Sequence, residues 1–132
     1  TARMFSSTRR LPEFDGDLKR LKKRYQSLDG DLDVLTRALY VWLHIQGKPG
    51  QSCGKRYVVM DGYGASSGCC LYKIRHMACA AIPGKGSQTG LRVICAYWPM
   101  IDTLEFIEIY FKADNERENQ GRVRDYIKMV HR

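Results

Sequence analysis

No apolar run in this sequence approaches the roughly 20 residues that a membrane-spanning helix needs. No basic start is followed by the apolar core of a secretory signal, so we do not expect secretion. The five cysteines form no C-x-x-C pair, which argues against a zinc knuckle or a dithiol redox motif. These absences predict a cytoplasmic protein with reduced thiols and without a membrane partner.

Phosphate-loop and metal motifs are also missing. No stretch reads G-x-x-x-x-G-K-[ST], so no nucleotide-hydrolase loop is expected. The three histidines are dispersed along the chain and suggest no metal site. His44, near the end of an expected helix, is predicted to be structural. The sequence therefore predicts neither a metal nor a cofactor.

Acidic residues are too few to balance the basic ones. There are 14 Asp and Glu against 22 Lys and Arg, which gives a formal net charge of +8. Such a surface is typical of proteins that bind polyanions, although a charged surface also keeps proteins soluble. At 132 residues, 44% of them hydrophobic, the chain is most simply one domain, residues 1–132.

The first part of the chain predicts two helices. Residues 1–11 suggest a short edge strand or a basic arm. From Pro12 an apolar stripe recurs at helical spacing, formed by Phe14, Leu18, Leu21 and Tyr25. Ser27 is positioned to cap a second helix that ends by Gly47, and about two residues would join the helices into a hairpin.

The organising feature is the stretch 71–112. Three runs rich in β-branched and aromatic residues alternate with two turn-rich gaps, the pattern of an antiparallel meander. Residues 56–60 suggest a further strand, and an apolar stripe near the C-terminus predicts a last helix. The fold class is α+β: a helical hairpin and a C-terminal helix packed on an antiparallel sheet of three to five strands.

Strand alternation separates two faces of this meander. One face is uniformly apolar and should bury against the helical hairpin, and His76 falls on it, which predicts a structural role. The other face mixes Leu104 and Phe106 with cations. Those cations are Lys73, Arg75, Arg92 and Lys112. We expect the last helix to cover the apolar part of the mixed face and to leave the cationic part open.

Further basic residues lie outside the meander. They are Lys19, Lys22 and Lys23 on the first helix, Lys85 in a hairpin loop and His131 near the C-terminus. The cations of the first helix fit a ridge that contacts nucleic-acid phosphates and a solvated helix face equally well.

The stretches FDGDLKRLKKRYQSLDGDLDVL, LYKIRHMA, GKGSQTGLRVI and LEFIEIYFKADN resemble the RelE/ParE superfamily of bacterial type II toxins, the RelE-like branch most closely. The similarity runs from about Phe14 to Tyr126. It implies a β-α-α-β-β-β(-β)-α toxin that cleaves mRNA on the ribosome and is held in check by a cognate antitoxin protein. The ParE branch of the same fold poisons gyrase.

The resemblance also implies catalytic residues. Lys73 and Arg75 match the basic pair of the first meander strand, Arg92 the arginine of the G-x-R motif, and Lys112 the basic position after the third strand. The branch often has an arginine after that lysine, where this chain has Ala113, and the tyrosine expected nearby is absent. Tyr126 and His131 are then the candidate substitutes.

Three hypotheses remain open from the sequence. The first is a ribosome-dependent endoribonuclease, with mRNA, the ribosome and an antitoxin as partners. The second is a gyrase-inhibiting toxin with no nuclease site. The third is a non-catalytic RNA-binding protein of the same fold. The convergent cations favour the first, because an inhibitory protein surface does not require them.

Overall fold

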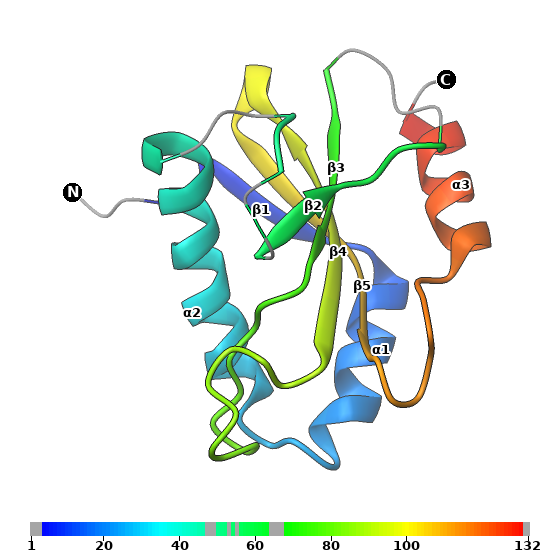
Figure 1. The fold of residues 1–132 in the computed structure, drawn as a ribbon. Helices are drawn as coiled ribbons and strands as arrows, with labels where there is room; N and C mark the ends of the chain where they lie inside the picture. Colours follow the sequence, from blue (N-terminus) through cyan, green and yellow to red (C-terminus); the bar gives the residue numbers. More distant parts are fainter. Residues whose placement is uncertain (1–3, 47–49, 53, 55, 64–67, 131–132) are drawn as a thin grey trace.

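The computed structural model describes residues 4–46, 50–52, 54, 56–63 and 68–130. The elements follow in the order β1 (Ser7–Arg10), α1 (Pro12–Lys22), α2 (Leu28–Val41), η1 (Trp42–Gln46), β2 (Tyr57–Val59), β3 (Cys70–Ile74), β4 (Leu91–Trp98), η2 (Pro99–Ile101), β5 (Thr103–Phe111) and α3 (Gln120–Val130). This is the predicted α+β class, with helices on an open sheet (Figure 1).

The sheet has five strands in the order β1-β5-β4-β3-β2. The meander of β3, β4 and β5 and the pairing of β2 with β3 are antiparallel, as expected. The prediction of a wholly antiparallel sheet is wrong, because β1 pairs with β5 in parallel. No hairpin joins β1 to β5, so the direction of β1 is not constrained by a tight turn.

Helices α1 and α2 follow β1 in sequence. Pro12 starts α1 at a position that needs no backbone N–H, and Phe14 stacks on Phe106 of β5 at 5.2 Å between ring centroids. The predicted two-residue link is wrong: residues 23–27 connect the helices. Ser27 occupies the N-cap position, but its hydroxyl donates to Asp31 Oδ2 (2.6 Å) instead of capping the helix.

A β-bulge in β5 decides which side chains lie on each face of the sheet. Ile94 pairs with Glu108 and Cys95 pairs with Phe106, so Ile107 is an extra residue with no partner in β4. The bulge reverses the alternation. Leu104 and Phe106 therefore lie with Cys95 on the face that α1 covers, and their predicted place on the mixed face is wrong.

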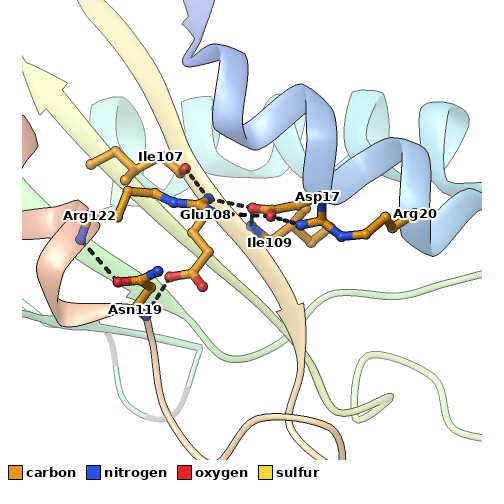
Figure 2. Close-up of polar contacts among 7 residues, drawn as sticks. All are labelled: Asp17, Arg20, Ile107, Glu108, Ile109, Asn119 and Arg122. Carbon is orange, nitrogen blue, oxygen red and sulfur yellow. Dashed lines mark hydrogen bonds and ion pairs between the residues drawn. The ribbon is translucent and has the colours of Figure 1, made fainter.

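β1 ends at Arg10, so the second half of β5 has no strand on its outer side. Two side chains close this edge instead (Figure 2). Asp17 of α1 accepts from the Ile109 N–H (3.3 Å), and Arg122 of α3 donates to the Ile107 carbonyl (3.1 Å). Asp17 and Arg122 also form an ion pair, with Nη1 2.5 Å from Oδ2, and both are largely buried. The pair ties α1, β5 and α3 together.

Helix α3 packs on the other face, which we call the α3 face. Its buried residues are Val123, Tyr126 and Ile127. Trp98 Nε1 donates to the Tyr126 hydroxyl at 3.0 Å, which places the helix over the end of β4. α3 lies over the part of this face around Trp98 and leaves the part that carries Arg92 uncovered. The prediction is correct for Trp98 but wrong for Leu104 and Phe106, which lie on the opposite face. None of the helices in the described part of the chain is long and apolar enough to cross a membrane.

Candidate functional site

The end of β3 is kinked, and the kink redirects two side chains. The backbone N–H groups of Arg75 and His76 both donate to the Arg56 carbonyl, at 2.8 and 3.2 Å. β3 consequently ends at Ile74, and the alternation expected over residues 71–79 does not continue. His76 is half-buried beside Arg75, so the prediction of a core histidine is wrong.

A pocket of about 390 Å³ lies beside the kink, at the start of β4, and we call it the basic pocket. Its lining residues are Arg75, His76, Gln88, Gly90, Arg92 and Lys112. Three of the four cations predicted on the mixed face therefore meet around one cavity. The histidine that joins them was missed from the sequence, because the acceptor at the kink is the backbone carbonyl of Arg56, the residue before β2, which is distant in sequence.

Hydrogen bonds hold the two walls of the basic pocket together. Arg92 Nη1 donates to the Arg75 carbonyl (2.9 Å) and to the Leu91 carbonyl (3.2 Å). Below it, the buried Thr89 hydroxyl donates to the Met77 carbonyl (2.7 Å) and accepts from the Leu91 N–H (3.2 Å). These bonds fix the segment that carries His76 against the start of β4.

Two cations of the basic pocket, Arg75 and Arg92, repel each other. Burial lowers the pKa of Arg92, and the neighbouring charge of Arg75 lowers it further. Within the described part of the chain, no carboxylate lies within ion-pair distance of Arg75, Arg92 or Lys112. Since a bound anion would relieve this repulsion, the pocket is suited to a group such as a phosphate.

Lys73 lies on the same face but is neutralised. Its Nζ is 2.8 Å from Glu118 Oε1, and the Glu118 side chain is almost fully buried. That oxygen makes no hydrogen bond of good geometry, so charge attraction dominates the contact. Tyr63 donates to the other Glu118 oxygen at 2.6 Å. Burial opposes ionisation of Glu118, but Lys73 and Tyr63 outweigh it and lower its pKa to about 2.

Tyr126 lies away from the basic pocket. Its hydroxyl donates to Glu105 Oε1 (2.7 Å) and accepts from Trp98 at the end of β4. Trp98 and Arg92 are six residues apart on β4, which corresponds to about 20 Å along the strand. Burial and the contact with Glu105 raise the pKa of Tyr126 above its usual range. The structure does not bring Tyr126 to the cations with which the sequence grouped it.

The outlying basic residues surround the same end of the molecule. Lys19 and Lys23 are exposed at the end of α1, and Lys22 pairs with Asp29 at 2.6 Å. Lys85 is exposed in the β3–β4 connection, which contacts the start of α2 through the bond from Ala81 N to Ser27 Oγ (3.0 Å). These segments lie together at the lower end of Figure 1. His131 lies outside the described residues.

A second polar cluster lies at the opposite end of β4. His44 Nε2 is 2.7 Å from Asp102 Oδ1, which also accepts from the Tyr97 hydroxyl at 2.7 Å. Asp102 has a left-handed backbone (φ 48°), and its second oxygen accepts from Ser6. The cluster joins the N-terminal segment, η1 and the β4–β5 turn, which is the structural role predicted for His44.

The described part of the chain was also searched for metal-binding groups and reactive thiols. No group of three or more His, Cys, Asp or Glu side chains there is arranged to hold a metal ion. The described cysteines, Cys69, Cys70, Cys79 and Cys95, form no disulfide. Burial raises the pKa of the Cys69 thiol to about 12, so it is protonated and weakly nucleophilic at neutral pH.

Comparison of the chain with protein-family models, with curated proteins and with solved structures finds no match.

Proposed function

We propose that this chain is a RelE-like toxin of a type II toxin–antitoxin system, an endoribonuclease that cleaves mRNA on the ribosome in the cytoplasm. The observation that carries the proposal is the basic pocket. It gathers Arg75, Arg92 and Lys112 without a carboxylate partner in the described part of the chain, and it places His76 beside them. The net charge of +8 supports a polyanionic substrate.

The chemistry of RNA cleavage fits these residue types. His76 takes the proton from a ribose 2′-hydroxyl, and the resulting oxygen attacks the adjacent phosphorus. Arg92, Arg75 and Lys112 stabilise the added negative charge on the non-bridging oxygens. The bond from phosphorus to the 5′-oxygen then breaks, and that oxygen takes up a proton. The products are a 2′,3′-cyclic phosphate and a 5′-hydroxyl, and the step needs neither metal nor oxidant.

Dependence on the ribosome follows from the shape of the site. Two arginines and a lysine line the basic pocket, so it is suited to one phosphate. Its described lining residues include no apolar side chain against which the neighbouring sugar would pack. Correct placement of the attacking group contributes ~7–11 kcal/mol to such reactions. We propose that the ribosome supplies this placement, and that a cognate antitoxin protein blocks the toxin in the cell.

Lys112 provides a sharp test, because it follows β5, is exposed and makes no described ion pair. Lys112→Gln should lower mRNA cleavage about a hundredfold, the usual loss for one charge-stabilising group. Lys128→Gln removes the same charge from the exposed side of α3 and is the matched control. Translation and the ends of the mRNA are followed in a cell-free system, with and without ribosomes.

The expected result is mRNA cleaved only with ribosomes present, by the wild type and Lys128→Gln but not by Lys112→Gln. When the chain is expressed in growing cells, growth arrest with continued protein synthesis and failed DNA replication would favour the gyrase-directed alternative. Binding of RNA without cleavage in either system would favour the non-catalytic alternative.

A further inference from the structure

Near Gly90, at the end of the sheet beside the basic pocket, Arg24, Tyr25 and Phe111 lie in contact, with the two rings tilted by 57°; we call them the aromatic–guanidinium cluster. The rings of Tyr25 and Phe111 are 5.9 Å apart between centroids. The Arg24 guanidinium carbon lies 5.1 Å from the Tyr25 centroid and 5.8 Å from that of Phe111. Both rings are half-buried, whereas the Arg24 side chain is 56% exposed. The guanidinium is therefore the most exposed member of the cluster.

An ion pair orients the Arg24 guanidinium. Arg24 Nη1 lies 3.2 Å from Asp114 Oδ2, in the segment that follows β5. An exposed pair of this kind contributes little to stability. Together with the rings beneath it, however, the pair restricts the orientations of the guanidinium. The cluster thus presents a planar cation to solvent, a group on which nucleobases stack in single-stranded RNA complexes.

Gly90 connects the cluster to the basic pocket. It lines the pocket, and a Cβ built at this position would lie 2.8 Å from Phe111 Cε2. Gly90 also has φ +92°, so a larger residue is disfavoured on both counts. Its carbonyl accepts from the N–H of Lys112, the residue after Phe111. Phe111 pairs with Leu91, so its ring lies on the α1 side of the sheet, opposite the face that carries Arg92. At this end of the sheet, the Gly90 backbone lies between the basic pocket and the Phe111 ring.

We propose that the aromatic–guanidinium cluster binds the base of the nucleotide adjoining the phosphate held in the basic pocket. This proposal rests on the proposed function, because it takes single-stranded RNA as the ligand. Stacking uses the π-face that every base has. The cluster consequently adds affinity for RNA without selecting a sequence.

Two probes separate base stacking from phosphate binding. The first is a tetranucleotide of 2′-O-methyl RNA, which lacks the hydroxyl needed for cleavage. The second is an abasic strand with the same number of phosphates. Their dissociation constants are measured by fluorescence anisotropy at low ionic strength, where phosphate contacts are strongest. The wild type should bind the base-bearing strand about tenfold more tightly, within the usual range for one stacked base.

Arg24→Lys tests the cluster itself, because lysine keeps the charge but has no plane on which a base stacks. This variant should lose the tenfold preference and keep its affinity for the abasic strand. Arg124→Lys is the matched control: Arg124 lies 5.9 Å from the Tyr63 ring, and neither residue lines the basic pocket. It should keep the preference unchanged.

Three other outcomes would contradict the stacking site, and one of them would also contradict the proposed function. Equal wild-type affinities for the two strands would exclude the stacking site and leave the basic pocket as a phosphate site. A preference that survives in Arg24→Lys would also exclude it. Failure of the wild type to bind either strand would overturn both the stacking site and the proposed function.

Discussion

Neutralising Asp17 should destabilise the protein more than any change to its surface ion pairs. The side chain of Asp17 is 6% exposed and that of its partner Arg122 15% exposed. Asp17→Asn keeps the shape and an oxygen that can accept from the Ile109 N–H, but it removes the charge opposite Arg122. The perturbation therefore isolates the electrostatic part of the contact drawn in Figure 2.

The size of the effect follows from what remains around Arg122. Removing one partner of a buried pair costs ~3–5 kcal/mol, because the other charge stays buried without compensation. Two features favour the lower end of this range. Arg122 still donates to the Ile107 carbonyl, and Glu108 remains close enough to stabilise the charge of Arg122. We expect a loss of about 3 kcal/mol in the free energy of unfolding, a large share of the ~5–15 kcal/mol typical of a domain.

The assay is urea unfolding followed by circular dichroism, with Asp29→Asn as the control. Asp29 pairs with Lys22 at the surface, so its neutralisation should cost ~0–1 kcal/mol. Arg122→Met and the double variant complete a mutant cycle, and the double variant should lose less than the sum of the single losses. A loss for Asp17→Asn no larger than that of the control would refute this account of the β5 edge.

Three further predictions concern the core, the pocket and acid stability. Ile107→Ala should lower the free energy of unfolding by ~2–5 kcal/mol in urea titrations, since the bulged residue is fully buried; a loss below 1 kcal/mol would contradict this. His76→Gln should lower ribosome-dependent mRNA cleavage by ~10²–10⁴-fold while the protein still melts normally, and cleavage within a few-fold of the wild type would exclude His76 as the base. Glu118 has a pKa lowered to about 2 in the folded protein. Its contribution to stability is therefore present above the unfolded pKa and lost as the pH falls towards 2. Between pH 5 and pH 2, the free energy of unfolding should therefore fall by on the order of 3 kcal/mol less in Glu118→Gln than in the wild type. Stability curves of the two proteins that run parallel over this pH range, measured by melting, would refute the prediction.

The elements of the fold were largely predictable because their signals are local. The apolar period of α1, the proline at its start and the acidic residues of its first turn depend only on neighbours in sequence. The same holds for the alternation in β3 and β4. The errors arise where one strand meets another. The bulge at Ile107 exists only in the pairing of β5 with β4, and it moved Leu104 and Phe106 to the opposite face.

The candidate site was predictable in part for the same reason. Arg92 and Lys112 were grouped correctly because they lie at the paired ends of two adjacent strands. Lys73 was grouped with them by alternation, which does not reveal that Glu118 neutralises it from 45 residues further along the chain. His76 was assigned to the core because nothing in its own segment indicates the kink made by the Arg56 carbonyl.

By itself, the sequence determined the α+β class, the antiparallel meander and the excess of cations along it, since periodicity, turn chemistry and charge are properties of the chain. Only the tertiary structure decided which of those cations pair with a carboxylate of the described residues, which of them do not, and which histidine joins them. Ion pairing and strand register are set by residues that are distant in sequence and adjacent in space. For the same reason, the contact of Phe111 with Gly90 appeared only once the chain was folded.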